Sequence, residues 1–185
     1  MTEREYQTKI QDLLRKIYEQ VEIQWYPFRG HGRHIYSPAV DVAVGPFAIE
    51  MRLENRYTEL LNETKDFITS LILMHNQNVA SYEEQTSFDS LLHFNENARC
   101  LLCIEVEDKG GRKHCIGNLV NASALGRIGI LVARSNEAFR VFLRQRVYLK
   151  FLAGVGKNTF KTDNALVLTS EQFDSCLTNI GRHQL

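Results

Sequence analysis

Three acidic residues in hydrophobic, strand-like segments are the strongest candidates for chemistry in this chain. Glu105 and Glu107 end the segment CLLCIEVE, residues 100–107, and residues two apart in a strand share a face. Asp41 interrupts the segment IYSPAVDVAVGPF, residues 35–47, where an unpaired buried carboxylate is costly. Convergence on a divalent cation explains all three acids, because Mg²⁺ prefers oxygen ligands and usually keeps several waters. Such an ion can activate water and offset charge on a phosphoryl transition state.

The alternative interpretation gives these acids structural roles only. Glu105 and Glu107 would then lie at the solvent-exposed end of a strand, and Asp41 would cap a turn. The spacing of the two glutamates by itself favours this structural interpretation, because two acids at alternate positions of a strand are a weak signal.

Positive charge follows the acids along the chain. The net charge is zero, yet residues 109–161 hold eleven Lys or Arg residues and a single acid, which leaves 11 basic and 21 acidic residues elsewhere. This asymmetry suggests an anionic partner and a surface that faces phosphates. We expect Lys109 and Arg112, and Arg140 and Arg144 one helical turn apart, to contact backbone phosphates. The alternative is that arginines on exposed helix faces serve solubility.

The hydrophobic period predicts a single α/β domain over residues 1–185. RGHGRH, residues 29–34, has the composition of a turn and favours a hairpin between the first two strands. The unit from residue 100 to 133 is strand–helix–strand, which normally gives parallel strands with a right-handed crossover. The expected order is helix 3–20, strands 21–28 and 35–47, helices 55–76 and 83–94, strand 100–107, helix 114–125, strand 128–133, helix 137–152, strand 165–169 and helix 171–178.

Bulk composition is that of an ordinary globular protein. The 185 residues are 44% hydrophobic and 24% charged, and no run of about 18 apolar residues indicates a membrane span. The charged N-terminus is unlike a signal peptide, so the four cysteines favour reduced thiols in the cytoplasm. Strand geometry sets Cys100 and Cys103 on opposite faces, which favours buried, inert thiols over a metal or redox site. The apolar stripe of residues 55–76 is core packing or a homodimer surface.

The order of elements and the placement of the acids resemble the PD-(D/E)xK nuclease superfamily, which has the restriction-endonuclease-like fold. Asp41 in SPAVDVAVGP matches the motif aspartate, with Pro38 three residues before it rather than adjacent. Glu105 in CIEVE matches the acid of the (D/E)-x-K pair, and Glu107 stands where the family usually has lysine. HCIGNLVNASALG and RIGILVA match the helix and strand that follow. The resemblance covers roughly residues 3–152 and implies an αβββαβ core, a mixed sheet flanked by helices, with a helical insertion around residues 50–97.

The resemblance also implies an activity, which is hydrolysis of phosphodiester bonds in DNA or RNA by a Mg²⁺- or Mn²⁺-dependent endonuclease. Asp41 and Glu105 would hold the metal beside the carbonyl of Val106, and Glu107 would hold a second metal or position the attacking water. Lys113, or Lys109, would take the usual lysine role at the pentavalent phosphate. An acid of the first helix, Glu19 or Glu5, would complete the metal shell. The alternative is an inactive nuclease-fold module that binds nucleic acid or a protein partner.

Overall fold

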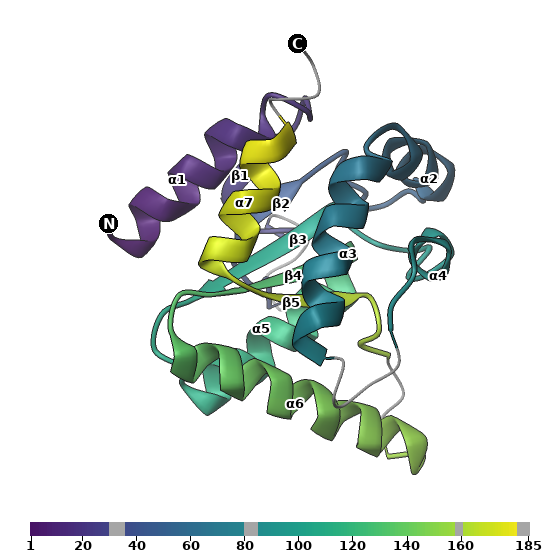
Figure 1. Cartoon of the computed structure of the whole chain (residues 1–185). Coiled ribbons are helices and arrows are strands. Elements are labelled where there is room, and N and C mark those ends of the chain that lie inside the picture. The colour runs from purple at the N-terminus through teal and green to yellow at the C-terminus, as the bar shows by residue number, and fades with distance from the viewer. Residues whose placement is uncertain (30–35, 80–84, 158–160, 181–185) are drawn as a thin grey trace.

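The computed structural model describes residues 1–29, 36–79, 85–157 and 161–180, which form an α/β structure around one sheet (Figure 1). The helices are α1 (Glu3–Leu14), α2 (Glu54–Glu63), α3 (Lys65–Val79), α4 (Phe88–Leu92), α5 (Arg112–Leu125), α6 (Asn136–Gly154) and α7 (Ser170–Ile180). The strands are β1 (Val21–Trp25), β2 (Val40–Val44), β3 (Cys100–Glu107), β4 (Gly126–Ala133) and β5 (Ala165–Thr169). None of the helices in these ranges is long and apolar enough to cross a membrane.

The sheet is mixed and follows the order of the strands in the chain, β1-β2-β3-β4-β5. β2 runs antiparallel to both of its neighbours, β1 and β3, whereas β3, β4 and β5 run parallel to one another. The predicted hairpin of the first two strands and the predicted parallel strand–helix–strand unit are therefore confirmed. Residues 30–35, which include most of the predicted turn, lie outside the described residues.

Helices cover both faces of the sheet, and each face has its own hydrophobic core (Figure 1). On β4, Ile128, Ile130 and Val132 pack into the core shared with α1, α3 and α7, whereas Leu131 and Ala133 pack into the core shared with α5 and α6. A strand buried on both faces has to be hydrophobic at every position, which explains the continuous apolar run that the sequence shows here.

The first helix is shorter than its hydrophobic pattern predicts. Thr2 caps α1, because its hydroxyl accepts from Glu5 N–H while the Glu5 carboxylate accepts from Thr2 N–H. The helix ends at Leu14 rather than at residue 20, and the chain then turns into β1. The predicted helix 55–76 is likewise two helices, α2 and α3, broken at Thr64. Of the predicted helix 83–94, α4 is the described part, and residues 83–84 lie outside the described residues.

The two cysteines of β3 lie on one face, so their predicted placement on opposite faces is wrong. Cys100 and Cys103 both pack in the core with α5, where their thiols donate to the carbonyls of Leu125 (3.6 Å) and Asn121 (3.9 Å). The alternation of side chains is interrupted at the start of β3, and it is regular from Leu102 through Val106. Both thiols are free and buried, as the composition predicted.

Candidate functional site

The candidate site lies where β2 and β3 separate. Their pairing runs from Val44 with Leu102 to Val42 with Ile104. The next main-chain donor on β3, the N–H of Val106, donates to Oδ2 of Asp41 at 2.8 Å. The carboxylate of Asp41 therefore binds the edge of β3 at the point of divergence.

Two glutamine side chains hold the other oxygen of this carboxylate. Oδ1 of Asp41 accepts from the amides of Gln7 on α1 (2.9 Å) and Gln24 on β1 (3.0 Å). Gln24 has a φ of 53°, in the left-handed region that residues other than glycine rarely adopt. The side-chain amide of Gln24 also donates to Oε1 of Gln7 (3.3 Å), so one network joins α1, β1 and β2. Backbone strain of this kind is often found at functional sites.

Sequence reasoning missed both glutamines. A glutamine on an amphipathic helix has the composition of a solvated face, yet Gln7 is almost completely buried. The available signal was its position three residues before Ile10, on the buried side of the stripe that α1 presents to the sheet.

Glu105 shares the site with Asp41. Continuing the register of β2 and β3 by one pair sets the two residues opposite each other, and their carboxyl groups lie close enough that each affects the pKa of the other. Glu105 is 2% exposed, and its Oε1 has no hydrogen-bond partner among the described residues. Burial raises the pKa of Glu105 well above its usual value, with further increases from the Cys103 sulfur and from Asp41. Burial also raises the pKa of Asp41, although the N–H donors of Val106 and Gln24 oppose it.

The pair is therefore short of positive charge. The pKa of the Cys103 thiol is itself raised by burial, so this neighbour is neutral near neutral pH and the like charge comes from Asp41. Two adjacent buried carboxylates cannot both stay ionised unless something compensates them. Either a proton on the pair or a bound cation would supply that compensation.

Further acids surround the mouth of the site. Glu107 is half-buried, and its carboxylate accepts from the N–H of Lys109 (3.0 Å). On α1, the pKa of Glu3 is raised by burial and then by the charges of Asp41, Asp108 and Glu107. Glu3 is thus the first-helix acid that faces the site.

The two first-helix acids expected from the sequence lie elsewhere. The carboxylate of Glu5 is used in the N-terminal cap of α1, and Glu19 is exposed beyond the end of that helix. The shorter helix is the physical reason, because Glu19 was expected only if the helix ran to residue 20.

One cation is fixed beside these outer acids. Arg134, directly after β4, forms an ion pair with Asp108 (2.9 Å), and its guanidinium lies 5.1 Å from the centre of the Tyr6 ring. Its charge opposes the rise in the pKa of Glu3. No local pattern predicts the place of Arg134, since it depends on the parallel pairing of β3 and β4.

Two of the three predicted metal ligands come together. Asp41 and Glu105 are in contact, but within the described ranges no group of three or more His, Cys, Asp or Glu side chains is arranged to hold a metal ion. Glu107 lies near enough to affect the pKa of Asp41 without completing such a group.

The predicted basic residues lie on the surface near the start of α5 and along α6. Lys109, Arg112 and Lys113 are exposed, and no hydrogen bond or ion pair between described residues joins Lys113 to Asp41 or Glu105. Arg112, Arg140 and Arg144 line one cavity of about 850 Å³, together with Gly110, Gly111, Glu137, Val141, Gln145 and Tyr148. Three of the four predicted nucleic-acid contacts therefore share one cavity, and what they bind stays a prediction.

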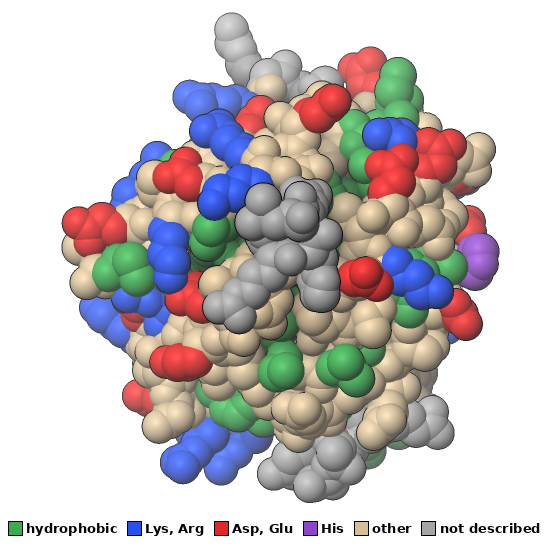
Figure 2. Space-filling model, turned by 45° about the horizontal axis from the view of Figure 1, so that its top comes forward, with side chains coloured by type: hydrophobic (Ala, Val, Ile, Leu, Met, Phe, Trp, Pro, Cys, Tyr) green, Lys and Arg blue, Asp and Glu red, His purple; other side chains and the backbone are tan. Residues whose placement is uncertain are grey.

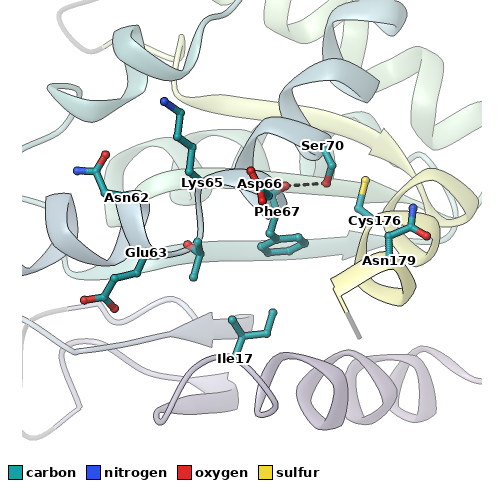
Figure 3. Close-up of a pocket in the computed structure, with 10 residues that line it drawn as sticks. Ile17, Asn62, Glu63, Lys65, Asp66, Phe67, Ser70, Cys176 and Asn179 are labelled. Carbon is teal, nitrogen blue, oxygen red and sulfur yellow. Dashed lines mark hydrogen bonds between the residues drawn. The ribbon is translucent and has the colours of Figure 1, made fainter. Parts of the chain in front are cut away.

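A second cavity, of about 470 Å³, has none of the predicted site residues (Figure 3). It lies between the junction of α2 with α3 and the helix α7, and Lys65, Asp66 and Cys176 are among its lining residues. Burial raises the pKa of the Cys176 thiol, which therefore stays protonated near neutral pH. The cavity offers no cluster of groups suited to catalysis, so the Asp41–Glu105 site is the stronger candidate.

Comparison of the chain with protein families, with curated proteins and with solved structures finds no match in any of the three. The function of this chain is therefore inferred from the geometry of the site.

Proposed function

We propose that this chain is a divalent-cation-dependent phosphodiesterase that acts on nucleic acid, with a restriction-endonuclease-like core. The observation that carries the proposal is the buried Asp41–Glu105 pair at the diverging end of β2 and β3. The chain order α1-β1-β2-β3-α5-β4, with three antiparallel strands followed by a parallel one, supports the same core.

The residues of the site fit a hard cation. Glu105 carries a buried oxygen without a partner, and the site offers oxygen donors from two carboxyl groups. Asp41 and Glu105 would hold the ion, with the carbonyl of Val106 as a further donor. A bound Mg²⁺ or Mn²⁺ lowers the pKa of a coordinated water and offsets negative charge on the phosphoryl group.

The remaining residues orient and complete the site. Gln7, Gln24 and the N–H of Val106 fix both oxygens of Asp41, so that its carboxylate needs no reorganisation on binding. Glu107, half-buried beside the pair, would accept a proton from the attacking water or position that water. Lys113 in the first turn of α5 would contact the phosphate from the exposed side.

Cleavage of plasmid DNA, single-stranded DNA and RNA in Mg²⁺ or Mn²⁺ tests the proposal. Glu105→Gln and Asp41→Asn should each lower the rate about 100-fold or more, because each removes an ionised oxygen ligand. Glu19→Gln, an exposed acid outside the site, serves as the matched control and should cleave at the wild-type rate. Cleavage that survives both site substitutions would refute the assignment of the site.

A second candidate function is an inactive module of the same fold that binds nucleic acid. It is favoured by the absence of a three-ligand group within the described ranges, and by Glu107 in place of lysine. The hydrogen bonds from the two glutamines to Asp41 would then be purely structural. This candidate predicts binding of nucleic acid without cleavage and without a cation at the acidic pair.

A further inference from the structure

We propose that the outer face of α6 and the start of α5 form a platform for single-stranded nucleic acid. Phosphates would contact Arg112, Arg140 and Arg144, and unstacked bases would lie on Tyr148 and Phe151. The inference rests on the proposed function, because it names the strandedness of the substrate that the same molecule would cleave.

The platform residues form one stripe along α6. Ala138, Phe142 and Leu149 bury the inner face of this helix against the sheet and α5. On the opposite face, the exposed residues Arg140, Arg144, Val147, Tyr148, Phe151 and Val155 recur at helical spacing.

Two large aromatic side chains on this stripe face solvent. Tyr148 is 51% exposed and Phe151 is 63% exposed, although the opposite face of the same helix is well packed. Apolar groups gathered on one exposed face indicate an interaction surface, whereas single exposed apolar residues need no explanation.

The arginines of the stripe are available for an anion. In the part of the chain that the structure describes, Arg112, Arg140 and Arg144 form no ion pair, and Glu137 is the one acid among the residues lining their cavity. Some cations elsewhere are paired with acids: Arg56 on α2 lies 3.1 Å from Glu59, and the half-buried Lys150 on α6 lies 2.9 Å from Asp163. Acidic and basic side chains are also interspersed on the face of the molecule shown in Figure 2. Three arginines in one cavity are complementary to phosphates.

The mixture of charge and aromatic rings favours a single strand over a duplex. A duplex presents phosphates to arginine, but its bases are stacked and hidden from an aromatic side chain on a helix surface. A single strand offers both groups, and base–aromatic stacking tolerates any sequence. Arg140 and Phe151 are eleven residues apart, or roughly 16 Å along the helix, which several nucleotides can cover.

A short turn connects the platform to the acidic site. Glu107 ends β3, and Gly110 and Gly111, three and four residues later, already line the arginine cavity. Gly110 has a φ of 68°, and a Cβ at this position would lie 2.8 Å from the backbone nitrogen of Ala138. Glycine at residue 110 therefore lets the turn pack against the start of α6. The turn thus connects Glu107, at the end of β3, directly to the arginine cavity.

Fluorescence anisotropy of labelled oligothymidylate, measured in EDTA so that no cleavage occurs, tests the inference against a duplex of equal length. We expect the single strand to bind at least about 10-fold tighter than the duplex. The double variant Arg140→Gln/Arg144→Gln should flatten the dependence of log K on log salt by about 1.4, since each phosphate contact on a single strand contributes about 0.7. Tyr148→Ala and Phe151→Ala should each weaken binding roughly 5- to 100-fold without changing that slope.

The control is the double variant Arg52→Gln/Arg56→Gln near α2, which removes two exposed arginines that lie beside acids. Thermal melting of every variant checks that the fold is kept. The inference would be overturned if the protein bound single strand and duplex equally and Tyr148→Ala and Phe151→Ala left the affinity unchanged. An unchanged salt slope in the arginine variant would also overturn it. A flat salt response together with self-association through this face would also overturn it, in favour of a homodimer surface.

The failure of the inference can be told apart from that of the proposed function. The binding assay in EDTA, repeated with Glu105→Gln, does not need the acidic site, so binding survives if only the nuclease proposal is wrong. Hydrolysis of bis(p-nitrophenyl) phosphate needs no platform, so the wild type and the arginine variant should both retain this activity even if the platform inference is wrong. Absence of this activity would count against the proposed function alone.

Discussion

At one end of the sheet the buried charges are carboxylates, and at the other end they are guanidinium groups. Asp41 and Glu105 lie together at the end where β3 finishes. Arg127, at the start of β4, and Arg146, whose guanidinium reaches the start of β5, are almost completely buried near the opposite end. Glu105, Arg127 and Arg146 are shielded from the solvent that would stabilise a charge, and Asp41 is half-buried.

The partners of these charges differ. Arg146 donates to the carbonyls of Thr162 (2.7 Å) and Ala165, and Arg127 donates to the carbonyl of Leu92 and the hydroxyl of Thr58 (3.3 Å). Carbonyl oxygens carry the opposite partial charge to a guanidinium, so the protein itself supplies the compensation. Burial lowers the pKa of Arg127, whose Nε and Nη1 have no partner among the described residues, so it is the less complete of the two arginines.

The comparison separates architecture from function. Arg146 among carbonyl oxygens holds a helix and a strand end together, whereas Arg127 keeps two buried N–H groups without a partner among the described residues. Buried carboxylates beside each other need a proton or a cation from outside the protein. The acidic end of the sheet is therefore the place to look for a ligand, and the arginine end is part of the scaffold.

The largest effect on stability should come from the arginine end. Arg146→Met should destabilise the protein by about 3–5 kcal/mol, because it leaves buried carbonyls without a donor. Arg144→Met, two residues earlier on the exposed face of the same helix, should change the free energy of unfolding by less than about 0.5 kcal/mol. Urea unfolding of both variants measures this, and similar values for the two would remove the distinction between scaffold and surface arginines.

A buried histidine near this end should make the protein sensitive to acid. His75 accepts the N–H of Val167 at Nδ1 (3.0 Å), and burial, then the charge of Arg146, lowers the pKa of His75 to about 3. Stability is therefore present above the unfolded pKa of about 6.5 and is lost as pH falls, by about 3 kcal/mol at pH 4. His75→Asn keeps an acceptor and removes the titration, so its unfolding free energy should vary less between pH 7 and pH 4. If the unfolding free energy of both proteins fell equally between pH 7 and pH 4, His75 would not be the cause of the acid sensitivity.

At the acidic end the sign is reversed. The pKa of Glu105 is raised in the folded protein, so its contribution to stability is present below its unfolded pKa and is lost as pH rises through its folded pKa. Glu105→Gln supplies an amide N–H that can donate to Asp41 and that does not ionise at high pH. The variant should therefore be more stable than the wild type by about 1–2 kcal/mol at pH 8. The gain should shrink toward pH 4.5 in thermal melts without metal. A variant that is less stable than the wild type at pH 8 would show that the carboxyl is not poised for a ligand.

The smallest expected effect concerns the strain at Gln24. Gln24→Ala loses the hydrogen bond to Asp41 and keeps a left-handed backbone, whereas Gln24→Gly loses the same bond and relieves the strain. The glycine variant should therefore be more stable than the alanine variant by about 1 kcal/mol. Chemical denaturation of the pair isolates the backbone term, and the reverse order would mean that the backbone at residue 24 is relaxed.

The sequence predicted the class of fold and the central pair of the site. Asp41 and Glu105 could be found because each is an acid inside a strongly apolar strand. Neither the hairpin of β1 and β2 nor the crossover from β3 to β4 predicts the antiparallel pairing of β2 with β3 that brings the two acids together. Gln7, Gln24, Glu3 and Arg134 could not be found. Their placement depends on the rotation of α1 against the sheet, on one left-handed residue and on the register of parallel strands, and no local pattern encodes these. The helix end at Leu14 was missed because Ile17 continues the helical spacing although the chain has already turned.

Calorimetric titration of Mg²⁺ and Mn²⁺ into the wild-type protein tests cation binding at the acidic pair, with Glu105→Gln as the matched variant and two buffers of different ionisation enthalpy. We expect binding to the wild type accompanied by release of about one proton, since the cation would displace a proton from the Asp41–Glu105 pair. We expect no such binding to Glu105→Gln. Absence of binding to the wild type, or equal binding to both proteins, would contradict a cation site at Asp41 and Glu105.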